Sequence, residues 1–149
     1  MLSYEYIRGL VEGEGSFSFC TVPKHIKDGL VIKEKLPAFT LAMSVRDKEL
    51  VGLVRDALDL KNKVYEYAPR KNKGSHNRQG MAILIVRDLY QLKNIIVPLF
   101  YSRLHGHKKR QFEEWIERIG LDLKVPGGYK MIYALYKTGY YENKLKQFE

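Results

Sequence analysis

A carboxylate at the end of a helical stretch is the first feature of this sequence that could do chemistry. Glu14 directly follows Gly13, and Gly9 lies four residues before Gly13 in a stretch that otherwise favours a helix. Each glycine costs a helix interior about 1 kcal/mol relative to alanine, so two of them need a reason. Residues four apart share one helix face, and a face without side chains allows a second helix to approach almost to backbone contact. The spacing therefore predicts a helix–helix seam with a carboxylate at its end.

The residues around Glu14 predict the elements that position it. A helix is expected over residues 3–13 with Ser3 as its N-cap, and a strand over 16–24 follows at once, with Phe17 and Phe19 on one face. Pro23 places this strand at an edge of its sheet or frays its end. The further elements expected are a strand over 36–45, a helix from Asp47 using Leu50, Leu53, Val54, Ala57 and Leu58, strands over 62–69 and 81–86, a helix from Asp88 that ends at Pro98, a helix to about 119, and a short helix over 129–137.

The stretch 7–15 resembles a known motif. Its residues Ile-Arg-Gly-Leu-Val-Glu-Gly-Glu-Gly, followed by Ser-Phe, are similar to the signature of the LAGLIDADG homing endonucleases, with Gly9 and Gly13 at the small positions and Glu14 at the metal-binding acid. Many members carry aspartate at that acid, and glutamate is an equivalent hard oxygen ligand. The resemblance covers about residues 3–119. It implies an α+β fold with an α-β-β-α-β-β-α core and a four-stranded antiparallel, saddle-shaped sheet. Residues 1–149 then form a single domain, with 120–149 as a C-terminal extension of helices.

The resemblance also implies a metal-dependent nuclease made of two chains. Glu14 and the main-chain carbonyl of Gly13 are expected to bind Mg²⁺, because two glutamates brought together at a seam repel each other unless a divalent cation lies between them. Only one copy of the motif is found in the sequence. A partner helix is therefore expected from a second chain, in a homodimer whose interface contains Tyr6, Gly9 and Gly13.

A basic side chain is expected to stabilise the transition state of phosphodiester hydrolysis. The family places a lysine four residues before an aromatic residue at the start of the helix that follows the third one. Lys108 matches that position, four residues before Phe112, and Lys109 is the close alternative. Arg103 and His107 are neighbours that could substitute.

The open face of the saddle is expected to lie in the major groove of double-stranded DNA, where base edges can be distinguished. Lysines on the hairpin tips are expected to contact phosphates and to set affinity rather than sequence preference. By strand alternation the residues assigned to the face are Ser18, Cys20, Val22, Lys24, Thr40, Ala42, Ser44, Tyr65, Tyr67 and Ala82, with Arg46, Arg70 and Arg78 at its ends and Lys27, Lys33, Lys35, Lys71 and Lys73 on the tips.

The composition is that of a globular, basic protein. Lys and Arg number 26 against 17 Asp and Glu, which gives a net charge of +9, and a basic surface is typical of nucleic-acid binding. No apolar run approaches the roughly 18 residues of a membrane span, and neither a basic amphipathic helix nor a lipidation signal is found, so no membrane partner is expected. The first residues resemble neither a signal peptide nor a transit peptide, and the lone Cys20 suits a reducing interior. The cytoplasm is expected, or an organelle interior for an organelle gene.

Two other functions remain open on the same fold. The first is an intron maturase, which binds intron RNA and assists splicing without cleaving DNA, and the second is a DNA-binding module that has lost cleavage. Many family members hold the attacking water with a glutamine at the end of the second strand, whereas this sequence has Ser44-Val45-Arg46 there. That role is then vacant or is filled by Arg46 or Ser44. The presence of Glu14 favours the endonuclease.

Overall fold

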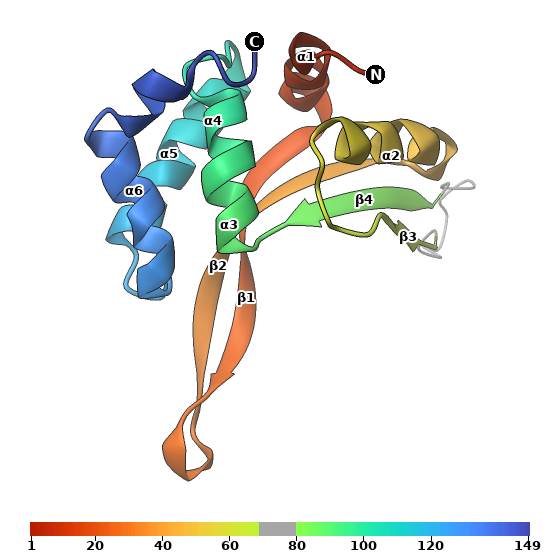
Figure 1. Ribbon diagram of the computed structural model, residues 1–149. Helices are drawn as coiled ribbons and strands as arrows, with labels where there is room; N and C mark the ends of the chain where they lie inside the picture. The colour runs from red at the N-terminus through yellow and green to blue at the C-terminus, as the bar shows by residue number, and fades with distance from the viewer. Residues whose placement is uncertain (69–79) are drawn as a thin grey trace.

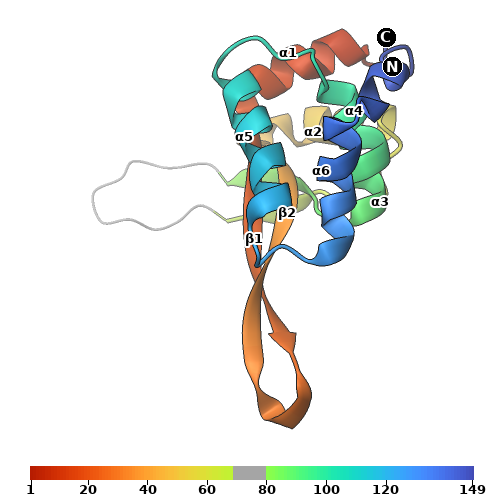
Figure 2. The ribbon, with the colours of Figure 1, turned by 90° about the vertical axis from the view of Figure 1, so that its left-hand side faces the viewer.

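The computed structural model, which describes residues 1–68 and 80–149, is a four-stranded sheet with helices packed on one face (Figures 1 and 2). All strand pairs are antiparallel, in the order β1-β2-β4-β3. The α+β class and the α-β-β-α-β-β-α order predicted from the sequence are confirmed. The elements are α1 (Tyr4–Glu14), β1 (Gly15–His25), β2 (Val31–Ser44), α2 (Lys48–Ala57), β3 (Tyr65–Tyr67), β4 (Met81–Val86), α3 (Leu89–Gln91), α4 (Val97–Phe100), α5 (His107–Leu121) and α6 (Lys130–Lys137).

The turn from α1 into β1 has no intervening loop. Ser3 is the N-cap of α1, as predicted, and its Oγ accepts a hydrogen bond from the Tyr6 N–H at 3.1 Å. At the other end, Gly15 donates its N–H to the Val11 carbonyl and at the same time begins β1. A Cβ at Gly15 would lie 2.5 Å from Val11 Cγ1, so only glycine allows the strand to leave the helix at this angle. This turn holds Glu14 at the junction of helix and sheet.

The core lies between the sheet and the helices and is built around Phe17. Its ring centroid is 5.5 Å from that of Phe39 on β2, 5.0 Å from Phe112 and 5.3 Å from Trp115 on α5, and 5.4 Å from Phe100 on α4. Aromatic pairs at these separations add to the area that they bury. The inward face predicted for Phe17 is confirmed, and the cluster fixes α5 and α4 over the start of β1.

The β1–β2 hairpin is longer than predicted. Pairing continues to His25 opposite Val31, so β2 begins at Val31 and not near residue 36. The tip shrinks to a few residues, where Asp28 and Gly29 take positive φ angles of 69° and 73°. The two strands stay hydrogen-bonded to each other beyond the last helix that covers them. The hairpin therefore projects from the body of the molecule (Figure 2). β1 lies at the edge of the sheet, as Pro23 predicted.

The third helix passes through Pro98, which was expected to end it. A π-helical segment, Leu92–Ile96, joins α3 to α4, and the Val97 N–H donates to the carbonyl of Leu92 five residues earlier. Pro98 therefore stands in the first turn of α4, directly after the π-helical turn, and does not end the helix. The helix continues to Phe100, which brings this ring into the core.

Two further expectations are corrected by the packing against the sheet. α2 buries Val51, Val54 and Ala57, whereas Leu53 is 46% exposed, because the apolar stripe of this helix is wider than the face that meets β2 and β4. β3 is shorter than the predicted strand 62–69, since the Asn62 side chain, rather than its backbone, bonds the Ile85 carbonyl at 2.8 Å. Within the described residues, no helix is long and apolar enough to cross a membrane.

Candidate active site and nucleic-acid interface

One face of α1 is open and carries almost no side chain. Gly9 and Gly13 are both exposed, and a Cβ placed on either of them would meet no heavy atom of the described residues within 4 Å. Tyr6 lies on the same side and is 47% exposed. The buried residues of this helix are Ile7, Arg8 and Val11. The smooth face predicted from the glycine spacing is therefore free to receive another helix.

Glu14 is the last residue of α1 and is exposed where the helix meets the sheet. The carbonyl of Gly13 belongs to the last helical turn, whose carbonyls have no intrahelical partner. Carboxylate and carbonyl oxygens are the ligands that Mg²⁺ accepts in proteins. Among residues 1–68 and 80–149, no group of three or more His, Cys, Asp or Glu could hold a metal ion. The donor types of one chain therefore suit Mg²⁺, but their number falls short of a complete shell.

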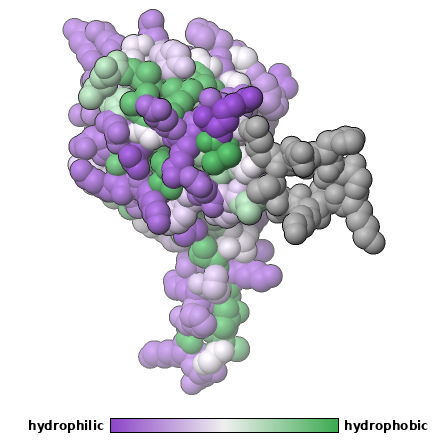
Figure 3. Space-filling model, turned by 90° about the vertical axis from the view of Figure 1, so that its right-hand side faces the viewer, coloured by the Kyte–Doolittle hydropathy of each residue, from purple (hydrophilic) through white to green (hydrophobic). Residues whose placement is uncertain are grey.

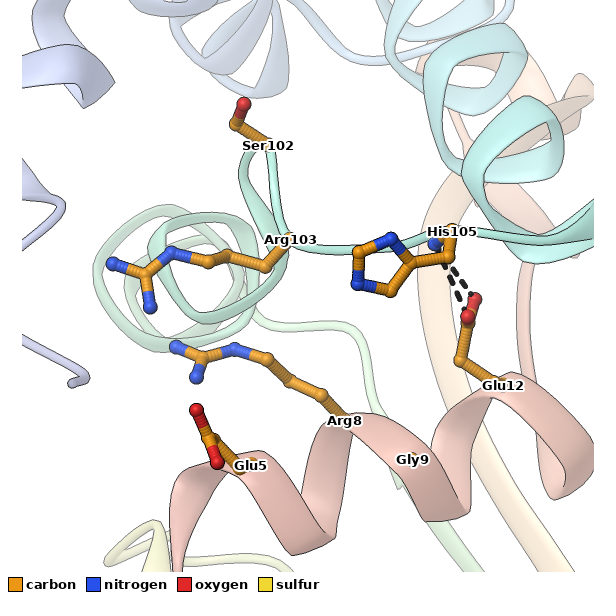
Figure 4. Close-up of a pocket in the computed structure, with 7 residues that line it drawn as sticks. All are labelled: Glu5, Arg8, Gly9, Glu12, Ser102, Arg103 and His105. Carbon is orange, nitrogen blue, oxygen red and sulfur yellow. Dashed lines mark hydrogen bonds between the residues drawn. The ribbon is translucent and has the colours of Figure 1, made fainter.

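Three hydrogen bonds join α5 and the loop before it to α1 and β1. The carboxylate of Glu12 accepts the N–H of His105 at 3.1 Å (Figure 4), and it accepts that of Gly106 at 3.3 Å. Three residues after Glu14, the Phe17 N–H donates to Oε1 of Gln111 at 3.0 Å. Sequence reasoning missed both Glu12 and Gln111, because their contacts join residues that are more than 90 positions apart in the sequence.

In the sequence, the lysines predicted to be catalytic lie between the loop that bonds Glu12 and the residue Gln111 that bonds β1. Lys108 is half-buried and Lys109 is exposed in the first turn of α5, where the Lys109 N–H donates to the Gly106 carbonyl at 3.0 Å. Arg103, named as a substitute, instead donates from Nη2 to the Leu145 carbonyl at 2.6 Å. The fold thus brings the predicted acid and the predicted lysines to the same end of α1 and assigns Arg103 to the C-terminal segment.

A hollow of about 300 Å³ separates α1 from the loop that leads to α5 (Figure 4). Arg8 and Arg103 extend side by side into it, and burial, followed by the charge of Arg103, lowers the pKa of Arg8. The residues that line it are Glu5, Arg8, Gly9, Glu12, Ser102, Arg103 and His105.

The open face of the sheet contains nearly all the residues predicted for it. Phe17, Phe39 and Leu41 point into the core, so their neighbours along each strand point the other way. Tyr65 and Tyr67 of β3 are 49% and 51% exposed. The predicted residues placed on this face are Ser18, Cys20, Val22, Lys24, Thr40, Ala42, Ser44, Tyr65 and Tyr67. Their contacts with DNA stay a prediction.

Ala82 is the exception, because it is buried and faces the core. It pairs with Met43, and its neighbour Leu84 pairs with Leu41, both on the inner side of β2. β4 is apolar on both faces, so the sequence could not decide which alternate residues point inward, and one residue of error reverses the assignment. The open face instead receives three β4 residues that sequence reasoning missed: Met81, Ile83 and Ile85.

The basic residues of the first hairpin lie in strands as well as at the tip. Lys33 and Lys35 belong to β2, and Lys27 lies at the tip. Lys35 pairs with Asp122 at 3.6 Å, and its N–H donates to the Lys124 carbonyl, so it lies against the loop between α5 and α6. The Lys124 N–H and the charge of Lys35 hold the pKa of the Asp122 carboxyl below its usual value.

The other predicted basic residues differ in their ion pairs and in their exposure to solvent. Lys24 pairs with Glu34 at 3.9 Å, whereas Lys33 and Arg46 are exposed. The hairpin shows purple, hydrophilic atoms along its length and green atoms near its end (Figure 3). The remaining predicted contacts, Arg70, Lys71, Lys73 and Arg78, lie outside the described residues.

The family model of the LAGLIDADG endonucleases matches residues 7–119. The chain belongs to this family. No match is found among curated proteins.

Several solved structures share the fold. I-LtrWI, a LAGLIDADG homing endonuclease whose structure was determined bound to target DNA, is 31% identical with a TM-score of 0.60, over 79% of this chain and 36% of its own. I-TnaI, also a homing endonuclease, is 20% identical with a TM-score of 0.61 over 99% of both chains. The meganuclease I-SmaMI, crystallised on uncleavable DNA, is 17% identical with a TM-score of 0.64, over 99% of this chain and 43% of its own. This chain therefore spans less than half the length of I-LtrWI and I-SmaMI.

Proposed function

We propose that this protein is a homing endonuclease that binds a long, nearly palindromic site in double-stranded DNA as a homodimer and hydrolyses one phosphodiester bond in each strand. The observation that carries the proposal is the open glycine face of α1, which ends at the exposed Glu14. Membership of the LAGLIDADG endonucleases and the DNA-bound structure of I-LtrWI support it.

A second copy of the chain is proposed to supply the helix that packs on Gly9 and Gly13. In a two-fold interface the same patch of each subunit meets its counterpart, so both glycine faces are covered at once. With the two-fold axis running along the two helices, both Glu14 carboxylates lie at the same end of the seam. This arrangement supplies the oxygen donors that one chain lacks, and it presents equivalent sheet faces to two half-sites.

Each part of the site then has a role in hydrolysis. Glu14 and the Gly13 carbonyl would hold Mg²⁺, whose chemistry is to neutralise phosphate charge and to activate a water. Lys108, or Lys109 beside it, would stabilise the charge that develops on the phosphate and the leaving oxygen. Glu12 would keep these lysines in place, because it bonds the loop that starts α5.

The open sheet face is proposed to lie in the major groove. Ser18, Thr40 and Tyr65 offer hydroxyl groups to base edges there. Ile83 and Ile85, which the structure adds to the face, offer apolar contact of the kind that recognises the methyl group of thymine. Lys33 and Arg46 are exposed and can reach phosphates, which position a protein on the duplex without reading its sequence.

The test is cleavage of a pool of duplexes with a long randomised segment, followed by sequencing of the cut ends. Purified wild-type protein should produce a defined set of ends with Mg²⁺ and none with EDTA. Glu14→Gln keeps the shape but removes the charge, so it should bind the selected duplex in Ca²⁺ like the wild type and cut nothing. Cleavage by Glu14→Gln at the wild-type rate would contradict the role of Glu14. Binding of intron RNA without any DNA cleavage would favour the maturase.

A further inference from the structure

Arg8 is a buried charge inside the signature helix. It is only 6% exposed, between the core residue Ile7 and the open Gly9. A buried guanidinium is costly unless its N–H groups are hydrogen-bonded. Here Nε donates to the Leu99 carbonyl at 2.8 Å, and Nη2 donates to the Phe148 carbonyl. Both partners are main-chain atoms, so the side chain links three segments of the fold rather than forming a simple ion pair.

The two carbonyls come from elements far from α1 in the sequence. Leu99 lies in the last turn of α4, where carbonyls have no intrahelical partner and a cation is favourable. Phe148 belongs to the C-terminal segment 140–148, beyond the residues that the family model matches. Its side chain is 8% exposed, and its ring meets Tyr4 in the first turn of α1 edge-on, with 5.2 Å between centroids. Phe148 therefore contacts α1 through both its carbonyl and its ring.

The C-terminal segment is itself held by the residues that follow α4. Tyr101 Oη donates to Glu142 at 2.8 Å, and Arg103 donates to the Leu145 carbonyl. Together with Arg8, these bonds tie the segment to the end of α4 and to α1. In Figure 1 the C-terminus lies beside α4 at the same end of the molecule as α1.

We propose that Arg8 and Phe148 are positioning residues, which set the orientation of α1 and thereby the place of Glu14 in the dimer. This inference rests on the proposed function. α1 has 11 residues, and isolated helices of that length are marginal in water, so tertiary contacts decide its orientation. Glu14 lies six residues beyond Arg8, about 9 Å along the axis, so that a tilt of about 10° at Arg8 would displace it by roughly 1.6 Å. In a two-fold dimer both acids would move.

A displacement of this size matters more for cleavage than for DNA binding. Metal ligands must lie within about 0.2 Å of their ideal distances, and a 1 Å misplacement of a catalytic group can cost about 100-fold in rate. The sheet face proposed to bind DNA is held by the core around Phe17, whose ring packs against Phe39, Phe100, Phe112 and Trp115, whereas the Phe148 ring packs against Tyr4 of α1. The expected signature is therefore a loss of cleavage with DNA affinity retained.

The experiment compares Arg8→Lys and Phe148→Ala with a conservative variant, Phe148→Leu, and with Lys146→Ala, an exposed neighbour, as the matched control. Lysine keeps the charge but loses the planar fork that bonds two carbonyls. DNA affinity is measured in Ca²⁺, and cleavage of the bound complex is measured in a single turnover after Mg²⁺ is added. Arg8→Lys and Phe148→Ala should bind DNA like the wild type and cut about 100-fold more slowly. Phe148→Leu should recover most of the rate, and Lys146→Ala should match the wild type.

Hydrogen exchange of the full-length chain gives a second readout that needs no nuclease activity. In Arg8→Lys and Phe148→Ala the amides of α1 should exchange faster, while those of α5 stay protected. Unchanged cleavage of the bound complex, or equal acceleration in α1 and α5, would overturn the positioning role. If Arg8→Lys does not fold, the comparison of Phe148→Ala with Phe148→Leu still tests the positioning role. A wild type that neither binds nor cuts DNA would refute the proposed function instead, and the exchange of α1 would still test the contact.

Discussion

Replacing Gly9 with alanine should stabilise the folded monomer and weaken the dimer. In α1 a Cβ at Gly9 would meet nothing within 4 Å among residues 1–68 and 80–149, so the methyl group fits the isolated chain without strain. Alanine is better than glycine in a helix interior by about 1 kcal/mol, and the unfolding free energy of the monomer should rise by about that amount. The same methyl group would lie in the seam of the proposed dimer, where the backbones must approach closely.

The cost to the dimer follows from the two-fold symmetry. Overpacking a close contact costs about 1–3 kcal/mol, and the substitution enters the seam twice, which gives about 2–6 kcal/mol. Since 1.4 kcal/mol corresponds to a tenfold change, the dissociation constant of the dimer should rise by at least about 30-fold. One substitution thus raises the stability of the folded monomer and lowers the stability of the dimer.

Sedimentation velocity over a range of concentrations gives the dimer constant, and chemical denaturation at dilutions where the chain is monomeric gives the unfolding free energy. Gly52→Ala in α2 is the matched control, because its Cβ would lie 3.8 Å from Arg55 Nη2, an ordinary contact. It should stabilise the monomer by about 1 kcal/mol and leave the dimer unchanged. A Gly9→Ala chain that dimerises as tightly as the wild type would show that the seam lies elsewhere. A lower unfolding free energy would show that this face is not open.

Three further predictions follow from the sheet and the C-terminal segment. Ala82→Leu should lower the unfolding free energy by about 1–3 kcal/mol in chemical denaturation, whereas Ala42→Leu on the open face should change it little. Lys33→Ala should weaken binding to target and scrambled duplexes alike and flatten the slope of log affinity against log salt by roughly 2 units per dimer, whereas Tyr65→Ala should change which bases are tolerated at an unaltered slope. Burial and an accepting carboxylate raise the pKa of Tyr101 from 10.0 to about 12. The stability that this tyrosine contributes is therefore complete below pH 10 and lost as the pH rises through about 12, and Tyr101→Phe should flatten the fall in unfolding free energy over that range. If the unfolding free energy of Tyr101→Phe fell as steeply as that of the wild type, the fall would belong to other titrating groups.

The sequence by itself determined what depends on neighbours along the chain. The cap at Ser3, the smooth face of Gly9 and Gly13, and the abrupt change from helix to strand after Glu14 follow from local propensity and from the periods of helix and strand. The inward direction of Phe17 follows in the same way. These features were predictable because each is decided within one or two turns of backbone.

Tertiary structure decided what depends on contacts between distant segments. Whether Ala82 or Ile83 faces the core is set by the register of β4 against β2, since the strand is apolar on both sides. The hydrogen bonds of Glu12 to His105 and of Arg8 to Phe148 join residues 93 and 140 positions apart, and no period in the sequence reports them. The position of the predicted lysines at the same end of α1 as the acid, and the contact of the C-terminal segment with the acid's helix, are properties of packing, because only the folded chain brings these distant segments together.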